Sequence, residues 1–213
     1  MPNNKISRRI AISGIAAAAA GAAAVPFITE ARSTSLDYKF SGPASDRELE
    51  LMPPSNCTPG TLSQTEGPYY TPRTPRRENL IEDGTGGETL VLEGLILTSG
   101  CVPVAGAVID IWHCDENGYY DNEGYRYRGH QFTDSSGAYR FITIRPKRYF
   151  RRTPHIHVKV KGKETRLLTS QLYFPDQASI NRSDGIFRES LNMALSRVGE
   201  IWYGRYDFFI AAA

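Results

Sequence analysis

The sequence is poor in the residue types that usually build metal and disulfide frameworks. It has four histidines and three cysteines among 213 residues. The spacing of Cys57, Cys101 and Cys114 does not resemble that of a zinc site, so we interpret these cysteines as structural. Outside the cytoplasm two of them can form a disulfide and leave one over, but the sequence does not assign the pairing.

The chain also lacks a strong excess of either charge. It carries 25 basic and 23 acidic side chains, which gives a formal net charge of +2. This near balance gives no support for nucleic acid, or for an anionic membrane surface, as the main partner. Hydrophobic residues make up 40% of the chain and aromatic residues 11%, which is enough apolar material for one packed domain.

The apolar run near the start of the chain is too short and too rich in alanine to make a good membrane span. It covers residues 10–25 and follows the polar, basic residues 3–9. This order is typical of a secretory signal, so we expect a signal peptide over residues 1–31, cleaved after Ala24 or Ala31. The pair Arg8-Arg9 favours twin-arginine export over an ordinary Sec signal. We therefore expect an exported protein, periplasmic or extracellular, that meets the membrane only during export.

Turn signals and short alternating runs predict an all-β domain behind this signal. Residues 32–60, with scattered proline, serine and glycine, are expected to be irregular. We expect strands over 89–97, 107–112, 138–144, 156–160, 167–174 and 202–210, and one short helix within 183–195. Many short strands of this kind indicate a β-sandwich over residues 61–213, with few short helices.

Two of the histidines form the motif His155-Ile156-His157 inside a predicted strand. Positions i and i+2 of a strand face the same side, so both imidazoles project together and can bind one metal ion as neighbouring ligands. Taken alone, the motif is more often a surface or core pair than a metal site. Nearby tyrosines strengthen the metal interpretation, because a phenolate is a hard anionic donor that favours ferric iron.

Five stretches of the chain share their order with one known family. They are TEGPYY at 65–70, PVAGAVIDIWH at 103–113, TDSSGAYRF at 133–141, TPHIH at 153–157 and SQLYF at 170–174. Together they resemble the intradiol ring-cleavage dioxygenases. The resemblance implies a β-sandwich with a non-haem Fe³⁺ site. It also implies an enzyme that cleaves a catechol-type ring between its two hydroxyls with O₂, giving a cis,cis-muconate-type product.

The resemblance also implies which residues form the site. The iron ligands would be Tyr120, Tyr149, His155 and His157. The catalytic residues would be Tyr149 as a base, Arg152 over the substrate ring and Gln171 near the metal.

The same resemblance implies how the substrate is bound. Tyr69 and Tyr70 would line the mouth of the pocket, and Arg152 would contact the substrate. The substrate would be a small aromatic diol or triol together with O₂, and a homodimer is possible. The loop from Tyr149 to His155 is shorter than in the protocatechuate and catechol dioxygenases, which opens or reshapes the pocket.

Two alternatives stay open at this point. Residues 103–108 and 133–141 also resemble transthyretin-like and carboxypeptidase-associated accessory domains, which would make the protein an exported, non-catalytic binding module. Alternatively, copper or zinc could occupy the two histidines. The tyrosines at 120 and 149 favour ferric iron and an enzyme over both alternatives.

Overall fold

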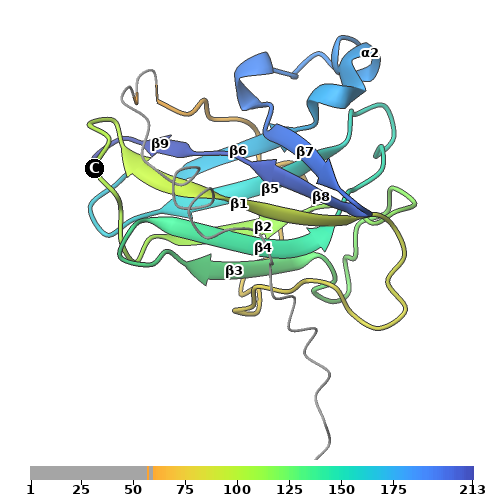
Figure 1. Cartoon of the computed structure of the whole chain (residues 1–213), viewed down its shortest axis with the longest axis horizontal. Coiled ribbons are helices and arrows are strands. Elements are labelled where there is room, and N and C mark those ends of the chain that lie inside the picture. Colours follow the sequence, from red (N-terminus) through yellow and green to blue (C-terminus); the bar gives the residue numbers. More distant parts are fainter. Residues whose placement is uncertain (1–56, 58–59) are drawn as a thin grey trace, which may run out of the picture. The chain divides into compact units, whose positions relative to one another are not determined.

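A computed structural model describes Cys57 and residues 60–213 of the chain (Figure 1). The predicted signal peptide and nearly all of the predicted irregular segment lie outside these residues. The described part forms two β-sheets with one short α-helix, which confirms the predicted all-β sandwich. Within it, no helix is long and apolar enough to cross a membrane.

The first sheet is built around the longest strand of the described part. Its strands run in the order β4-β1-β8-β7, and β9 also pairs with β1. The bounds are β1 (Thr89–Thr98), β4 (Ala138–Ile144), β7 (Ala194–Val198), β8 (Ile201–Arg205) and β9 (Phe208–Ile210). β1 is antiparallel to β4 and parallel to β8 and β9. Its sequence is almost continuously apolar, as expected of a strand covered on both faces.

The second sheet carries the predicted metal motif. Its strands run in the order β3-β2-β5-β6 and are all antiparallel. The bounds are β2 (Val108–Trp112), β3 (Arg128–Phe132), β5 (His155–Lys161) and β6 (Leu168–Tyr173). Ile156, Val158 and Val160 of β5 belong to the core between the sheets. Because side chains alternate along a strand, His155 and His157 face away from that core.

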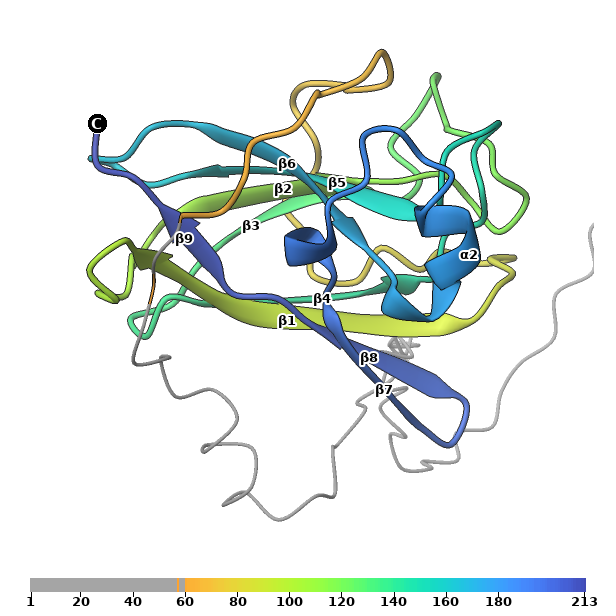
Figure 2. The ribbon, with the colours of Figure 1, turned by 90° about the horizontal axis from the view of Figure 1, so that it is seen from above.

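The two sheets stack as layers with the main core between them (Figure 2). This core includes fully buried side chains from both sheets, among them Leu90, Leu92, Ile109, Ile111, Phe141, Ile156 and Leu172. Each buried side chain of this size contributes roughly 1.5–3 kcal/mol relative to an exposed one. The core therefore gives the outer face of the second sheet a rigid support.

The short helix predicted within 183–195 is present only as three residues of 3₁₀ helix. That range contains the 3₁₀ turn η2 (Glu189–Leu191) and the start of β7. The short helix lies earlier, as η1 (Pro175–Gln177) followed by α2 (Ala178–Asn181). Leu191 and Met193 of the predicted range are buried against the sandwich, so their apolar spacing reflects tertiary packing rather than a helical stripe.

Three further differences concern strands. The predicted strand 202–210 divides into β8 and β9 around Tyr206 and Asp207. β3 was not predicted, because its sequence RGHQF has little apolar alternation. β7 was not predicted either, because its residues are mostly exposed. The bounds of β1, β2, β4, β5 and β6 agree with the prediction to within one residue at each end.

The structure assigns the cysteine pairing that the sequence left open. Cys57 forms a disulfide with Cys101. Cys114 is a buried free thiol that donates to the carbonyl of Lys147 at 3.2 Å.

Candidate active site

The site lies on the outer face of the second sheet and is covered by residues 61–70, here called the covering segment. Figure 2 shows this part of the chain on the side of the β2-β5-β6 layer away from β1. It is fixed along β6 by hydrogen bonds from Gln64 N to Thr169 O, 2.8 Å, and from Ser170 Oγ to Leu62 O, 2.7 Å. Gly67 has φ +71°, and a Cβ there would lie 3.3 Å from Cε1 of His157. The covering segment therefore closes directly over the imidazole.

Three of the four predicted ligands converge beneath this cover. The hydroxyl oxygen of Tyr120 lies 3.3 Å from Nε2 of His155 and 3.1 Å from Nε2 of His157. The two Nε2 atoms lie 3.1 Å apart. Both histidines are buried, at 2% and 3% exposed, and Tyr120 is 9% exposed. One oxygen and two nitrogen donors thus face a common point shielded from water.

The imidazoles are held in the form that binds metals. Nδ1 of His155 lies 2.6 Å from the carbonyl of Thr153, which assigns the proton to Nδ1 and leaves a lone pair on Nε2. Burial, reinforced by the nearby charge of Arg152, lowers the pKa of His155 to about 4. Burial and the neighbouring His155 lower the pKa of His157 well below its usual value. Both rings are therefore neutral at pH 7.

On its Nδ1 side, the ring of His157 is held by stacking rather than by a hydrogen bond. Its Nδ1 is buried and has no partner among the described residues. The indole of Trp112 stacks on it with ring centroids 4.8 Å apart and an interplanar angle of 7°. Trp112 is itself fully buried.

Gly118 explains how the two tyrosine loops meet. It has φ +86°, and a Cβ there would lie 2.2 Å from the carbonyl oxygen of Arg148. Only glycine allows this contact, which brings the loop of Tyr120 against the loop of Tyr149. The rings of Tyr120 and Tyr149 meet edge to face, 5.4 Å apart. Burial raises the pKa of the Tyr120 phenol, so it ionises only next to a compensating cation.

Tyr149 is the most exposed of the four predicted ligands and interacts with Tyr69. Their hydroxyls form a hydrogen bond, which together with partial burial raises the pKa of Tyr149. The ring of Tyr69 stacks on Tyr120 at 4.6 Å. Tyr69 therefore touches both predicted tyrosine ligands.

Tyr70 lies one side chain farther from the donors. Its hydroxyl donates to Asp110 at 3.1 Å, and its ring packs against Trp112 at 4.8 Å. Burial and the charge of Asp110 raise the pKa of Tyr70 to about 12. Tyr70 therefore packs against Trp112, which in turn stacks on His157.

Arg152 and Gln171 are brought together, as expected of residues on one side of the site. Nη2 of Arg152 donates to Oε1 of Gln171 at 2.6 Å. Nε2 of Gln171 donates to the carbonyl of Thr65 in the covering segment at 2.9 Å. Gln171 is opposite His157 in the β5-β6 register, which explains why a β6 residue reaches the site.

Sequence reasoning missed two charged residues here. Asp184 accepts a hydrogen bond from Nε of Arg152 at 2.8 Å. Arg128 is fully buried and donates to the carbonyls of Asp121 and Tyr69, so it joins the loop after Tyr120 to the covering segment. The partners are far apart in the chain, and no local pattern signals them.

The donor set fits ferric iron. No group of three or more His, Cys, Asp or Glu able to hold a metal occurs in the part of the chain that the structure describes. The protein oxygen that faces the two histidine nitrogens is instead the hydroxyl of Tyr120. A mixed nitrogen and hard-oxygen set suits a trivalent cation better than copper or zinc.

Comparison with known proteins identifies the family. The family model described as dioxygenase matches residues 65–195, more than half of the chain. The dioxygenase domain of a dioxygenase–carbohydrate-binding fusion from Streptomyces sp. SirexAA-E is 38% identical, covers 72% of this chain and 99% of that one, and gives a TM-score of 0.69. A hydroxyquinol 1,2-dioxygenase from a Rhizobium species is 29% identical over 74% of this chain. The chain belongs to the intradiol ring-cleavage dioxygenase family.

The chain also matches other intradiol dioxygenases, over part of their length. A catechol 1,2-dioxygenase from Acinetobacter baylyi is 29% identical over 60% of this chain. The 3-chlorocatechol 1,2-dioxygenase structure from Rhodococcus opacus, 24% identical, covers 79% of this chain at a TM-score of 0.67 and shows the shared fold. The chain spans 66% of the hydroxyquinol relative and 49% of the catechol relative. Membership of this family favours an enzyme over the accessory-module alternative.

Proposed function

We propose that this protein is a non-haem Fe³⁺ dioxygenase that cleaves a catechol-type ring between its two hydroxyls, giving a cis,cis-muconate-type diacid. The convergence of Tyr120 Oη with Nε2 of His155 and His157 carries the proposal. The ring carbons are oxidised and O₂ is reduced. Both oxygen atoms enter the product, so the overall reaction needs no other reductant.

The residues that would hold the iron are Tyr120, Tyr149, His155 and His157. Iron bound there would supply Lewis-acid polarisation of the catechol oxygens. Two phenolates would offset most of its charge in a buried site. Burial by the covering segment and by Trp112 would exclude water from the donors.

The chain's own residues would handle the proton and the developing charge. Tyr149 is partly exposed, and as a phenolate it would take a proton from a substrate hydroxyl and become a neutral phenol. Tyr69 would hold that phenol in place through the hydrogen bond between their hydroxyls. Arg152 would stabilise negative charge on the substrate, because its guanidinium is fixed in a planar fork beside Gln171.

The proposal includes export. It is supported by the predicted signal over residues 1–31 and by the Cys57–Cys101 disulfide, a bond typical of proteins outside the cytoplasm. The substrate would be a small aromatic diol or triol, and a homodimer remains a prediction.

A ligand variant and a matched control test the function. The iron-loaded protein should consume one O₂ per catechol and produce the ultraviolet absorbance of a muconate. His157→Ala should lose iron and activity together, because it removes one nitrogen donor. His130→Ala, which changes a histidine on β3 of the same sheet, should keep both. Full iron and activity in His157→Ala would refute the ligand set.

A further inference from the structure

Asp184 is a buried carboxylate whose strongest partner is the candidate substrate-binding arginine. It forms an ion pair with Nε of Arg152 at 2.8 Å, and its side chain is 2% exposed against 24% for Arg152. The second acceptor on the guanidinium is Gln171, 2.6 Å from Nη2, and the hydroxyl of Tyr173 lies 3.4 Å from the same nitrogen. Nη1 has no hydrogen-bond partner within the described residues, so it is the nitrogen left to meet a substrate. Two acceptors on two edges fix the plane of the fork.

The same carboxylate also fixes the backbone that leads to the histidine motif. Oδ2 of Asp184 accepts the backbone N–H of Thr153 at 2.9 Å. The carbonyl of Thr153 is the acceptor for Nδ1 of His155 at 2.6 Å. One carboxylate oxygen therefore ties the guanidinium of Arg152 to the residue that orients His155.

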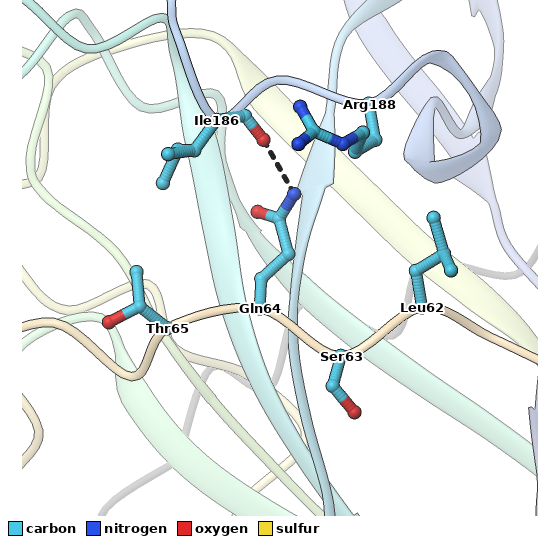
Figure 3. A pocket seen from close by; sticks show the side chains of 6 residues that line it. All are labelled: Leu62, Ser63, Gln64, Thr65, Ile186 and Arg188. Carbon is cyan, nitrogen blue, oxygen red and sulfur yellow. Dashed lines mark hydrogen bonds between the residues drawn. The ribbon is translucent and has the colours of Figure 1, made fainter.

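Asp184 is itself held in place by hydrogen bonds, so it can fix the position of Arg152. Its Oδ1 accepts the backbone N–H of Ile186 at 3.2 Å, which closes a tight turn. Nε2 of Gln64 donates to the carbonyl of Ile186 at 2.6 Å, across a hollow of about 310 Å³ between the covering segment and this turn (Figure 3). Oε1 of Gln64 accepts the hydroxyl of Tyr173 at 2.5 Å.

The segment before the turn is docked by a second buried polar side chain. Asn181 at the end of α2 accepts the hydroxyl of Thr153 at 2.5 Å and donates to the carbonyl of Phe174 at 2.9 Å. The position of Asp184 is therefore set by contacts on both sides of it.

We propose that Asp184 is the positioning residue that aims Arg152 at the substrate. This inference rests on the proposed ring-cleaving function, in which Arg152 contacts substrate. Asp184 itself would touch neither the substrate nor the ligands. Without the charge of Asp184, the guanidinium would keep only the neutral acceptors Gln171 and Tyr173 and would rotate away from the productive orientation. The amide oxygen of an asparagine would still accept the Thr153 N–H, so the four ligands would keep their places.

The test compares iron-loaded Asp184→Asn with the wild-type protein. The amide keeps the size of the side chain and removes its charge. We expect kcat on catechol to fall roughly tenfold to a hundredfold, as for a misplaced catalytic group, with a smaller change in KM. Iron content should stay unchanged. The absorbance shift on binding 4-nitrocatechol, which reads binding without turnover, should need more ligand to saturate.

Two further variants separate positioning from general loosening. Asp176→Asn makes the same change at an exposed carboxylate of the same segment, paired with Arg145, and should behave as wild type. Asp184→Asn combined with Arg152→Gln should be no slower than Arg152→Gln alone, because the two act through one group. Additive losses in the double variant would overturn the inference.

The outcomes distinguish this inference from the proposed function. A wild-type protein that binds iron but does not open catechol would overturn both. An active wild type with unchanged kinetics in Asp184→Asn would overturn the positioning role alone. If Asp184→Asn does not fold, Asp184→Glu decides, because it keeps the charge and moves it by one methylene. A lowered kcat with full iron in that variant supports the role, and wild-type kinetics overturns it.

Discussion

At the scale of single residues, the histidine motif is the part of the site that elementary rules predict best. Strand alternation alone places His155 and His157 on one face, and the structure brings their Nε2 atoms to 3.1 Å. Strand alternation says nothing of Tyr120 or Tyr149, which came from the family resemblance. Neither strand alternation nor the family resemblance identified Asp184, because it lies 32 residues from Arg152 in sequence and in a turn without a motif.

A variant at Tyr149 distinguishes metal binding from proton transfer. Tyr149→Phe removes the hydroxyl that bonds Tyr69 and leaves the three converging donors untouched. We expect iron to remain bound while kcat falls roughly a hundredfold, in the range of general-base losses. Iron content and single-turnover rates check this, with Tyr119→Phe, an exposed neighbour of Tyr120, as control. A fully active Tyr149→Phe variant would contradict the assignment of Tyr149 as the general base.

At the scale of elements, strands with clear alternation were predictable and tertiary effects were not. The range 138–144 was predicted as a strand with the bounds that β4 has, because AYRFITI alternates and follows a turn closed by Asp134. The range 183–195 holds only a 3₁₀ helix, because its buried apolar residues pack against the sandwich instead of forming a helical stripe. β8 and β9 are separated at Tyr206, whose backbone carbonyl packs against Gly94 of β1. These two residues are far apart in sequence, so no local pattern indicates the break.

Gly94 of β1 gives the prediction at this scale. A Cβ there would lie 2.0 Å from the carbonyl oxygen of Tyr206, which accepts the hydroxyl of Tyr139 at 2.7 Å. Gly94→Ala should therefore destabilise the fold by at least about 2 kcal/mol, because backbone must move. Gly100→Ala, where the nearest atom is 3.7 Å away, should change stability little. Equal unfolding midpoints in denaturant for the two variants would contradict the packing.

At the scale of the whole molecule, the disulfide ties Cys57 to the turn after β1. The cysteines are 44 residues apart, so the chain-entropy model gives about 4 kcal/mol of stabilisation. The double variant Cys57→Ser and Cys101→Ser should lose free energy of unfolding on that scale, and reductant should bring the wild type to the same level. A fully reduced wild type with unchanged stability would contradict the contribution assigned to this bond.

The whole-molecule claim is that two imidazoles and two phenols, held on the outer face of one sheet, form a ferric site that chelates catechols. It is tested most directly by the metal content and visible spectrum of the purified protein, before and after anaerobic catechol. We expect near-stoichiometric iron and a strong red-brown tyrosinate band that shifts when catechol binds. A protein that stays colourless after iron loading would contradict it.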